Sequence, residues 1–157
     1  MTEQARKRRL QDTLIISGNG VIAYSVWGLA KTAIILSLLD EGILRRIVSI
    51  DSDIPMSAIY LVTGALLLVD LAVRWYVGAS ARAEGAGKSR GPAYLCVALL
   101  AALGNAWSAA LVAFGASPTL SLLDLVVTLA IELSSLAALA LVIYCAIGLR
   151  RLGAATG

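Results

Sequence analysis

The stretch "LVVTLAIELSSLAALALVIY", residues 125–144, decides the fold, because it is apolar almost throughout and as long as one membrane crossing. A helix rises 1.5 Å per residue, so about 20 residues cross a hydrocarbon core about 30 Å thick. Three similar runs precede it, and the four predicted helices cover residues 14–39, 56–79, 93–116 and 120–149. The sequence therefore predicts a single domain, residues 1–157, built as an all-α bundle of four antiparallel transmembrane helices.

The composition agrees with this fold and excludes several functional classes. Hydrophobic residues make up 59% of the chain and charged residues 15%, and the mean hydropathy is +0.86. A soluble domain carries about a quarter charged residues. The chain has no histidine, which excludes His-ligated haem and histidine-based acid–base chemistry. No nucleophile motif or metal-ligand spacing is present, so we expect no enzyme, no catalytic residues, no metal and no cofactor.

The basic residues predict the orientation in the membrane. Arg45 and Arg46 lie on one side, against nine basic residues on the side shared by both termini and the middle loop: Arg6, Lys7, Arg8, Arg9, Arg82, Lys88, Arg90, Arg150 and Arg151. Positive residues accumulate on the cytoplasmic face. We therefore expect a multi-pass protein of the plasma membrane with both termini cytoplasmic. A nucleic-acid surface needs a basic face with aromatic platforms, and none is expected here.

The connecting segments carry further signals. Residues 2–12 are expected to form a basic helical lead-in at the lipid headgroups, and residues 40–55 a short helix lying in the interface. The cytoplasmic loop 79–92 contains "GAGKS", but Arg82 stands where a phosphate-binding loop needs its first glycine, so no nucleotide is expected. The short link 115–121 makes the last two helices antiparallel neighbours.

The carboxylate of Glu132, near the middle of the opening stretch, is the principal candidate for a site. At 100° per residue, Asp124, Thr128 and Ser135 lie on the same side of the helix. A carboxylate at mid-bilayer costs about 2.5–3.5 kcal/mol and faces the protein interior or a watery cavity. Lys31 of the first helix lies at a similar depth. We expect it to pair with Glu132, with Asp124 or with both.

The second and third helices carry further polar residues. Asp70 and Arg74 are four apart with the acid first, which favours a helical ion pair, and Arg74 is expected to reach the cytoplasmic headgroups. Asn105 is expected to make an interhelical hydrogen bond. Small residues that let membrane helices approach closely lie in the first and third helices: Gly18, Gly20, Gly28, Ala98, Ala101 and Ala109.

The aromatic residues fall into two groups by depth. One group forms the expected interfacial belt: Trp75, Tyr76, Tyr94 and Tyr144. Tyr24, Trp27 and Trp107 lie deeper. They either pack within the bundle or line a pocket for a cationic or aromatic ligand.

Two functional interpretations stay open. In the first, the chain is a non-enzymatic accessory or assembly component, whose charged residues fix the bundle and whose partners are the lipid bilayer and a homo-oligomer or larger membrane complex. In the second, it is a small ion- or proton-coupled transporter or channel that uses Glu132 and Lys31, with Asp70 in support. The sequence slightly favours the first.

Overall fold

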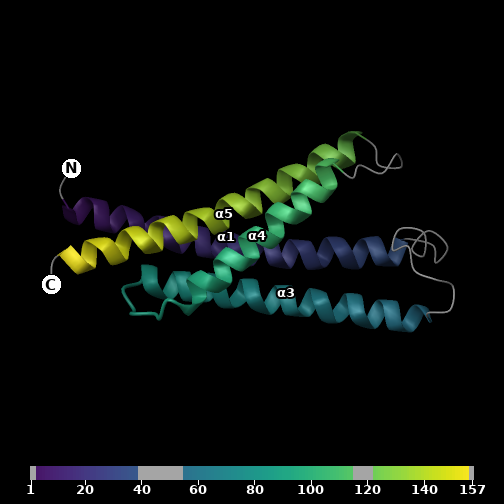
Figure 1. Cartoon of the computed structure of the whole chain (residues 1–157), viewed down its shortest axis with the longest axis horizontal. Coiled ribbons are helices and arrows are strands. Elements are labelled where there is room, and N and C mark those ends of the chain that lie inside the picture. The colour runs from purple at the N-terminus through teal and green to yellow at the C-terminus, as the bar shows by residue number, and fades with distance from the viewer. Residues whose placement is uncertain (1–2, 39–54, 115–121, 156–157) are drawn as a thin grey trace.

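The computed structural model describes residues 3–38, 55–114 and 122–155. These residues form four helices and no strand, labelled as in Figure 1: α1 (Glu3–Leu38), α3 (Met56–Gly85), α4 (Ala93–Phe114) and α5 (Leu122–Ala155). Each of the four is long and apolar enough to cross a membrane. The predicted four-helix bundle is confirmed, and the chain has the architecture of a multi-pass membrane protein. The interfacial helix expected within 40–55 lies outside the described residues, apart from position 55.

The helices run further than the apolar pattern predicted. α3 ends at Gly85 rather than at residue 79, and α5 ends at Ala155 rather than at residue 149. α1 begins at Glu3, so the helix predicted over residues 2–12 is confirmed from residue 3 onward and is continuous with the apolar run that begins at residue 14. The apolar pattern stops where the hydrocarbon stops, whereas alanine, arginine and lysine continue a helix into water. The loop is therefore shorter, residues 86–92. Gly87, its second residue, has a φ of 85°, a conformation that glycine adopts without strain.

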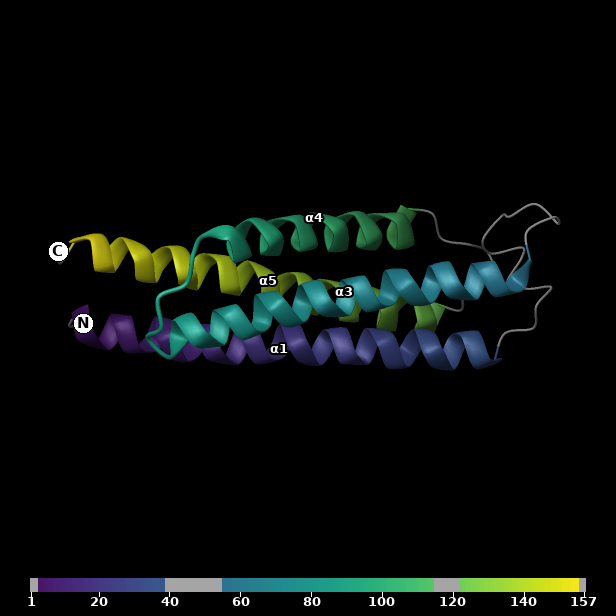
Figure 2. The same ribbon diagram turned by 90° about the horizontal axis from the view of Figure 1, so that it is seen from below.

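The helices pack as two hairpins. α1 lies against α3 and α5, and α4 lies against α5 and α3. The expectation that α4 and α5 are antiparallel neighbours is confirmed (Figure 2). Both termini lie at one end of the bundle, called here the terminal end, and α4 and α5 diverge from α1 and α3 toward the opposite, far end (Figure 1).

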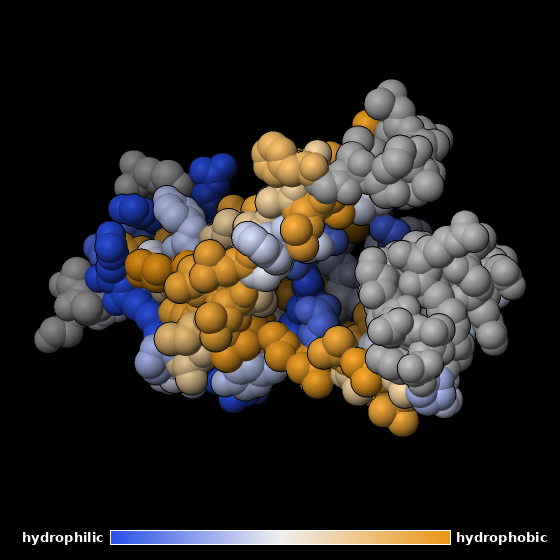
Figure 3. All heavy atoms as spheres, turned by 45° about the vertical axis from the view of Figure 1, so that its right-hand side comes forward, coloured by the Kyte–Doolittle hydropathy of each residue, from blue (hydrophilic) through white to orange (hydrophobic). Residues whose placement is uncertain are grey.

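The buried core is small and lies toward the terminal end. Its largest cluster contains fully buried apolar side chains from all four helices: Leu14, Val21, Val77, Tyr94, Leu139 and Val142. Large apolar side chains elsewhere point outward, such as Leu61, Leu100 and Phe114, so that hydrophobic groups cover much of the body (Figure 3). Such a surface is suited to contact with lipid.

Glycines bring the backbones of α1 and α3 into direct contact. A Cβ atom on Gly78 would lie 2.6 Å from the carbonyl oxygen of Gly18, and one on Gly18 would lie 2.8 Å from the carbonyl oxygen of Gly78. Seven residues on, a Cβ on Gly85 would lie 2.7 Å from a side-chain atom of α1. Of the glycines predicted to allow close approach, only Gly18 does so, because Gly20 has ordinary spacing and Gly28 faces open space.

Candidate ion-binding site inside the bundle

Asn105 lies near the middle of α4. α4 is the shortest of the four described helices, with 22 residues from Ala93 to Phe114. Asn105 stands 12 residues after Ala93 and 9 before Phe114, which places it about 18 Å and about 14 Å from the two ends at 1.5 Å per residue. It is only 4% exposed, and Ala98 and Ala109 are buried on the same face. This face of α4 points inward, as its alanines predicted.

Arg74 joins three helices at this level. Its Nε donates to both carboxylate oxygens of Asp70, at 3.0 and 2.8 Å, within α3. Its Nη1 donates to Ser135 Oγ of α5 at 2.7 Å, and its Nη2 donates to Asn105 Oδ1 of α4. Asn105 Nδ2 also donates to Ser135 Oγ, at 2.8 Å. These four residues form what we call the Arg74 network.

The direction of the Arg74 side chain differs from the prediction. The expected ion pair with Asp70 and the expected interhelical bond of Asn105 are both present. Arg74 does not turn toward the headgroups, and its side chain is 13% exposed. The planar guanidinium has donors on several edges, and acceptors on three helices lie at its own level. The hydrogen bonds of Arg74 inside the bundle therefore take the place of those that its guanidinium would form with water at the headgroups.

Lys31 lies against the polar stripe of α5, but its partner differs from the prediction. Its Nζ donates to Thr128 Oγ1 at 3.3 Å, one helical turn from Glu132. In the described residues Lys31 forms no ion pair with Glu132. The alternative pairing with Asp124 stays a prediction, because the Asp124 side chain lies outside what the structure describes.

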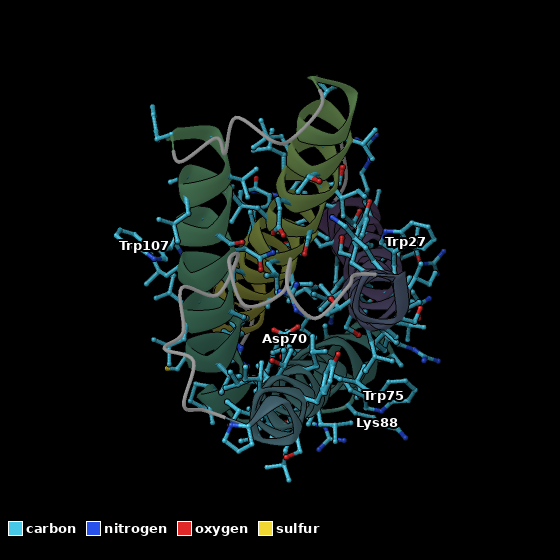
Figure 4. The ribbon with its side chains drawn as sticks, turned by 90° about the vertical axis from the view of Figure 1, so that its right-hand side faces the viewer. Trp27, Asp70, Trp75, Lys88 and Trp107 are labelled. Carbon is cyan, nitrogen blue, oxygen red and sulfur yellow. The ribbon has the colours of Figure 1, made fainter. Side chains whose placement is uncertain are left out.

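Glu132 lines a partly open cavity of about 140 Å³ between α1, α3 and α5. This volume is large enough for several water molecules. Seven polar side chains line it: Tyr24, Ser25 and Thr32 of α1, Asp70 and Arg74 of α3, and Glu132 and Ser135 of α5. Figure 4, viewed from the far end, shows Asp70 pointing from α3 toward the space between the helices. Figure 3 shows hydrophilic atoms deep between hydrophobic flanks in the middle of the molecule.

Of the three charged side chains that line this cavity, two pair with each other and the third does not pair within the described residues. Arg74 is bound to Asp70, whereas Glu132 makes no hydrogen bond or ion pair within the described part of the chain. A carboxylate held away from water is stabilised by a bound cation or a bound proton. Among the residues that can be described, no three acidic or cysteine side chains lie together as a metal site needs.

The three deep aromatic residues do not form one pocket. Tyr24 lines the cavity, but Trp27 and Trp107 are 55% and 69% exposed. Figure 4 shows both indoles on the outside of the bundle, Trp27 beside α1 and Trp107 beside α4. α1 packs mainly against α3 and α5, so the side that carries Trp27 has no neighbouring helix to cover it.

A second polar cluster closes the terminal end. Arg150 of α5 binds Glu84 of α3 through two hydrogen bonds, Nε to Oε1 at 2.9 Å and Nη2 to Oε2 at 3.0 Å. Tyr94 of α4 donates to Glu84 Oε2, and the Arg150 guanidinium lies 5.8 Å from the centre of the Tyr94 ring. Arg150 Nη2 also donates to the carbonyls of Arg90 and Gly91, at 3.1 and 3.3 Å.

The sequence did not predict this Glu84–Tyr94–Arg150 cluster. The basic pattern places Arg150 only on the cytoplasmic side, and the aromatic pattern places Tyr94 in the interfacial belt, yet Tyr94 is 1% exposed. One signal was available, because Glu84 is the single acid among the basic residues of segment 79–92. An isolated acid of that kind needs a specific basic partner.

No protein family, no curated protein and no solved structure matches this chain. The function proposed below therefore rests on the cavity, on the two polar clusters and on the arrangement of the helices.

Proposed function

We propose that the chain is a small proton-coupled membrane transporter or proton channel in which Glu132 is the proton-binding carboxylate. One observation carries the proposal: Glu132 lines a cavity in the membrane-spanning part of the bundle and forms no hydrogen bond or ion pair within the described residues. Ionisable residues inside a membrane are rare and mark substrate, ion and proton pathways. Lys31, bonded to Thr128 one turn away, is the second residue of the pathway.

The asymmetry of the bundle supports a pathway that opens at one end. The helices diverge toward the far end (Figure 1), whereas the terminal end holds the buried core and the Glu84–Tyr94–Arg150 cluster. A transporter binds its ion near the midplane and exposes the site to one side at a time. The arrangement corresponds to the state that faces away from the terminal end.

The nine basic residues that the sequence assigns to the side of both termini and the middle loop support an orientation with the terminal end in the cytoplasm. The cavity then faces the outside of the plasma membrane in this state. A proton enters from outside, binds Glu132, and leaves to the cytoplasm when the Glu84–Tyr94–Arg150 cluster opens.

The test is proton flux into liposomes that contain the purified protein and an internal pH-sensitive dye. A potassium gradient with valinomycin drives the flux. Wild-type protein is expected to conduct protons, and Glu132→Gln is expected to reduce the flux at least about tenfold, because an amide cannot take up and release a proton at neutral pH. Asp12→Asn is the matched control, since Asp12 is an exposed carboxylate that does not line the cavity. Equal flux in Glu132→Gln and wild type would overturn the proposal.

A second measurement separates proton binding from transport. Infrared difference spectra of reconstituted protein, recorded between about pH 5 and about pH 9, are expected to show the carbonyl band of a protonated carboxylic acid. This band should vanish in Glu132→Gln and remain in Asp12→Asn. A spectrum unchanged by Glu132→Gln would show that this carboxylate does not exchange protons.

A membrane-embedded assembly component is the second candidate function. The specific observation that favours it is the Asp70 side chain, which is 51% exposed although it lies one turn from Arg74 at mid-membrane depth. A helix from another protein or from a second copy would cover it. This function predicts that gentle extraction from the native host yields a stoichiometric membrane partner and that liposomes of the protein alone conduct no protons.

A further inference from the structure

Two adjoining hollows lie between α1 and α5 at the terminal end. One has a volume of about 450 Å³ and the other about 330 Å³, and both are lined by Arg6, Leu10 and Tyr144. The first hollow adds Arg151 and Ile147, and the second adds Arg9 and Leu141, among other side chains. Each hollow therefore combines guanidinium groups with an apolar wall.

Helical spacing places these groups together. Arg6, Leu10 and Thr13 follow one another along one side of α1, and Tyr144, Gly148 and Arg151 do so along one side of α5. A Cβ on Gly148 would lie 3.3 Å from a methyl carbon of Leu10, so the glycine allows the two helices to approach here. The two hollows therefore lie beside the site where α1 and α5 approach each other closely.

The hollows have positive charge and no acid in their walls. Arg6, Arg9 and Arg151 line them, and no carboxylate does so. Among the described residues these three guanidinium groups take part in no ion pair, since Arg74 and Arg150 are the arginines that pair. Guanidinium groups bind phosphate through paired hydrogen bonds, so the chemistry of the rim suits a phosphate group.

The depth of the hollows identifies the source of that phosphate. Arg150 donates to the carbonyls of Arg90 and Gly91, just before α4 enters the membrane at Ala93. Its neighbour Arg151 is therefore at the membrane boundary. Figure 3 shows hydrophilic side chains gathered at this end beside the hydrophobic body. Leu10, Leu141 and Ile147 form the apolar wall, where an acyl chain would lie.

We propose that these hollows bind one anionic phospholipid, with its phosphate between Arg6, Arg9 and Arg151 and an acyl chain along the groove between α1 and α5. Basic pockets between transmembrane helices at the cytoplasmic side bind anionic headgroups in this way. The inference is independent of the proposed transport function, because it involves neither Glu132 nor the central cavity.

Native mass spectrometry of the detergent-purified chain tests the proposal. Phosphatidylglycerol and phosphatidylcholine with identical acyl chains are titrated separately. One phosphatidylglycerol is expected to bind at least about tenfold more tightly than phosphatidylcholine, and the triple variant Arg6→Gln, Arg9→Gln, Arg151→Gln is expected to lose this preference. The single variant Arg151→Gln is expected to weaken phosphatidylglycerol binding about fivefold, and it provides the test if the triple variant does not fold.

The matched control removes the same charge at the same end of the bundle. Arg8→Gln, Lys88→Gln and Arg90→Gln change three exposed residues that line neither hollow, and this variant is expected to keep the preference. An equal loss in the control would overturn the proposal in favour of diffuse attraction to charge. Displacement of the lipid by excess inorganic phosphate would overturn it in favour of a site for free anions.

Discussion

At the scale of single residues, Arg74 shows how a charge becomes stable in the middle of a membrane. The guanidinium receives a carboxylate from its own helix, an amide oxygen from α4 and a hydroxyl oxygen from α5. No buried side-chain nitrogen or oxygen of the described chain lacks a hydrogen-bond partner. The Arg74 network therefore links α3, α4 and α5, while Glu132 lines the adjoining cavity and forms no hydrogen bond or ion pair within the described residues.

Replacing Arg74 by glutamine should destabilise the bundle. The change removes hydrogen bonds to three side chains, and polar interactions between membrane helices contribute about 0.6 kcal/mol each on average, so we expect a loss of about 2 kcal/mol in the free energy of unfolding. Arg82→Gln on the same helix is the control, because Arg82 is exposed and its side chain has no hydrogen bond among the described contacts. Unfolding in mixed micelles followed by circular dichroism measures both.

Adding Asp70→Asn to Arg74→Gln should recover part of that loss, since it removes the carboxylate that has lost its partner. Equal stability of Arg74→Gln and Arg82→Gln would show instead that the Arg74 network contributes nothing to the fold.

The sequence revealed which residues are polar and on which face of a helix they lie, but not their partners on other helices. The Asp70–Arg74 pair is local, so a spacing of four residues was enough to predict it. Arg74 turns inward because Asn105 and Ser135 stand at its level, and that depends on how three helices slide past one another. The sequence also left the relative height of α1 and α5 uncertain by one helical turn. Glu132 was predicted to bind Lys31, whereas Thr128, one turn away on α5, accepts its hydrogen bond.

At the scale of helices, the closest contact is between α1 and α3. Their backbones touch at Gly18 and Gly78, where any side chain would push the helices apart. In a bilayer no hydrophobic force joins two helices, and close packing of small residues takes its place. The Gly18–Gly78 contact therefore holds the first hairpin together, near the terminal end.

Gly78→Ala should weaken this hairpin, and Gly64→Ala should not. A methyl group at position 78 would lie 2.6 Å from the carbonyl oxygen of Gly18, whereas position 64 has nothing within 4 Å. We expect Gly78→Ala to lower the free energy of unfolding by about 1–3 kcal/mol. Gly64→Ala should leave it unchanged or raise it by up to about 1 kcal/mol, because alanine favours the helix. Thermal unfolding in one detergent compares the two variants, and a larger loss in Gly64→Ala would contradict the packing.

Helix number and type followed from the apolar runs, and the basic residues 2–12 were predicted to be helical, but the extensions of α3 and α5 at the terminal side were not predicted. These ends extend beyond the hydrocarbon, where no apolar pattern marks them, and they provide the functional groups of that side. Arg6 and Arg9 come from the first turns of α1, and Glu84 from the last turn of α3. Hydropathy alone would have treated these residues as loop or lead-in.

At the scale of the whole molecule, the bundle has two unlike ends. The terminal end is closed by apolar packing and by the Glu84–Tyr94–Arg150 cluster, while the helices diverge toward the far end (Figure 1). In the proposed transport function, opening the terminal end separates α3 from α5 and breaks the bidentate contact between Glu84 and Arg150.

The proposed orientation can be tested with one engineered cysteine. Cys96 and Cys145 are the free cysteines of the described chain, and replacing both by alanine gives a background without thiols. Ser89→Cys then places one thiol in the exposed loop between α3 and α4. A membrane-impermeant maleimide is expected to label it only after the cells are permeabilised, because the excess of basic residues predicts that this end lies in the cytoplasm. Labelling of intact cells would reverse the orientation.

The Arg74 network also has a consequence for biosynthesis. The ribosome makes α3 before α4 and α5, so Arg74 enters the membrane with Asp70 as its single partner. Asn105 and Ser135 arrive only when the later helices are inserted. A chain interrupted before residue 135 therefore carries an arginine with unused donors at mid-membrane depth, and the hydrogen bonds of Arg74 are completed only in a chain whose last helix has been made.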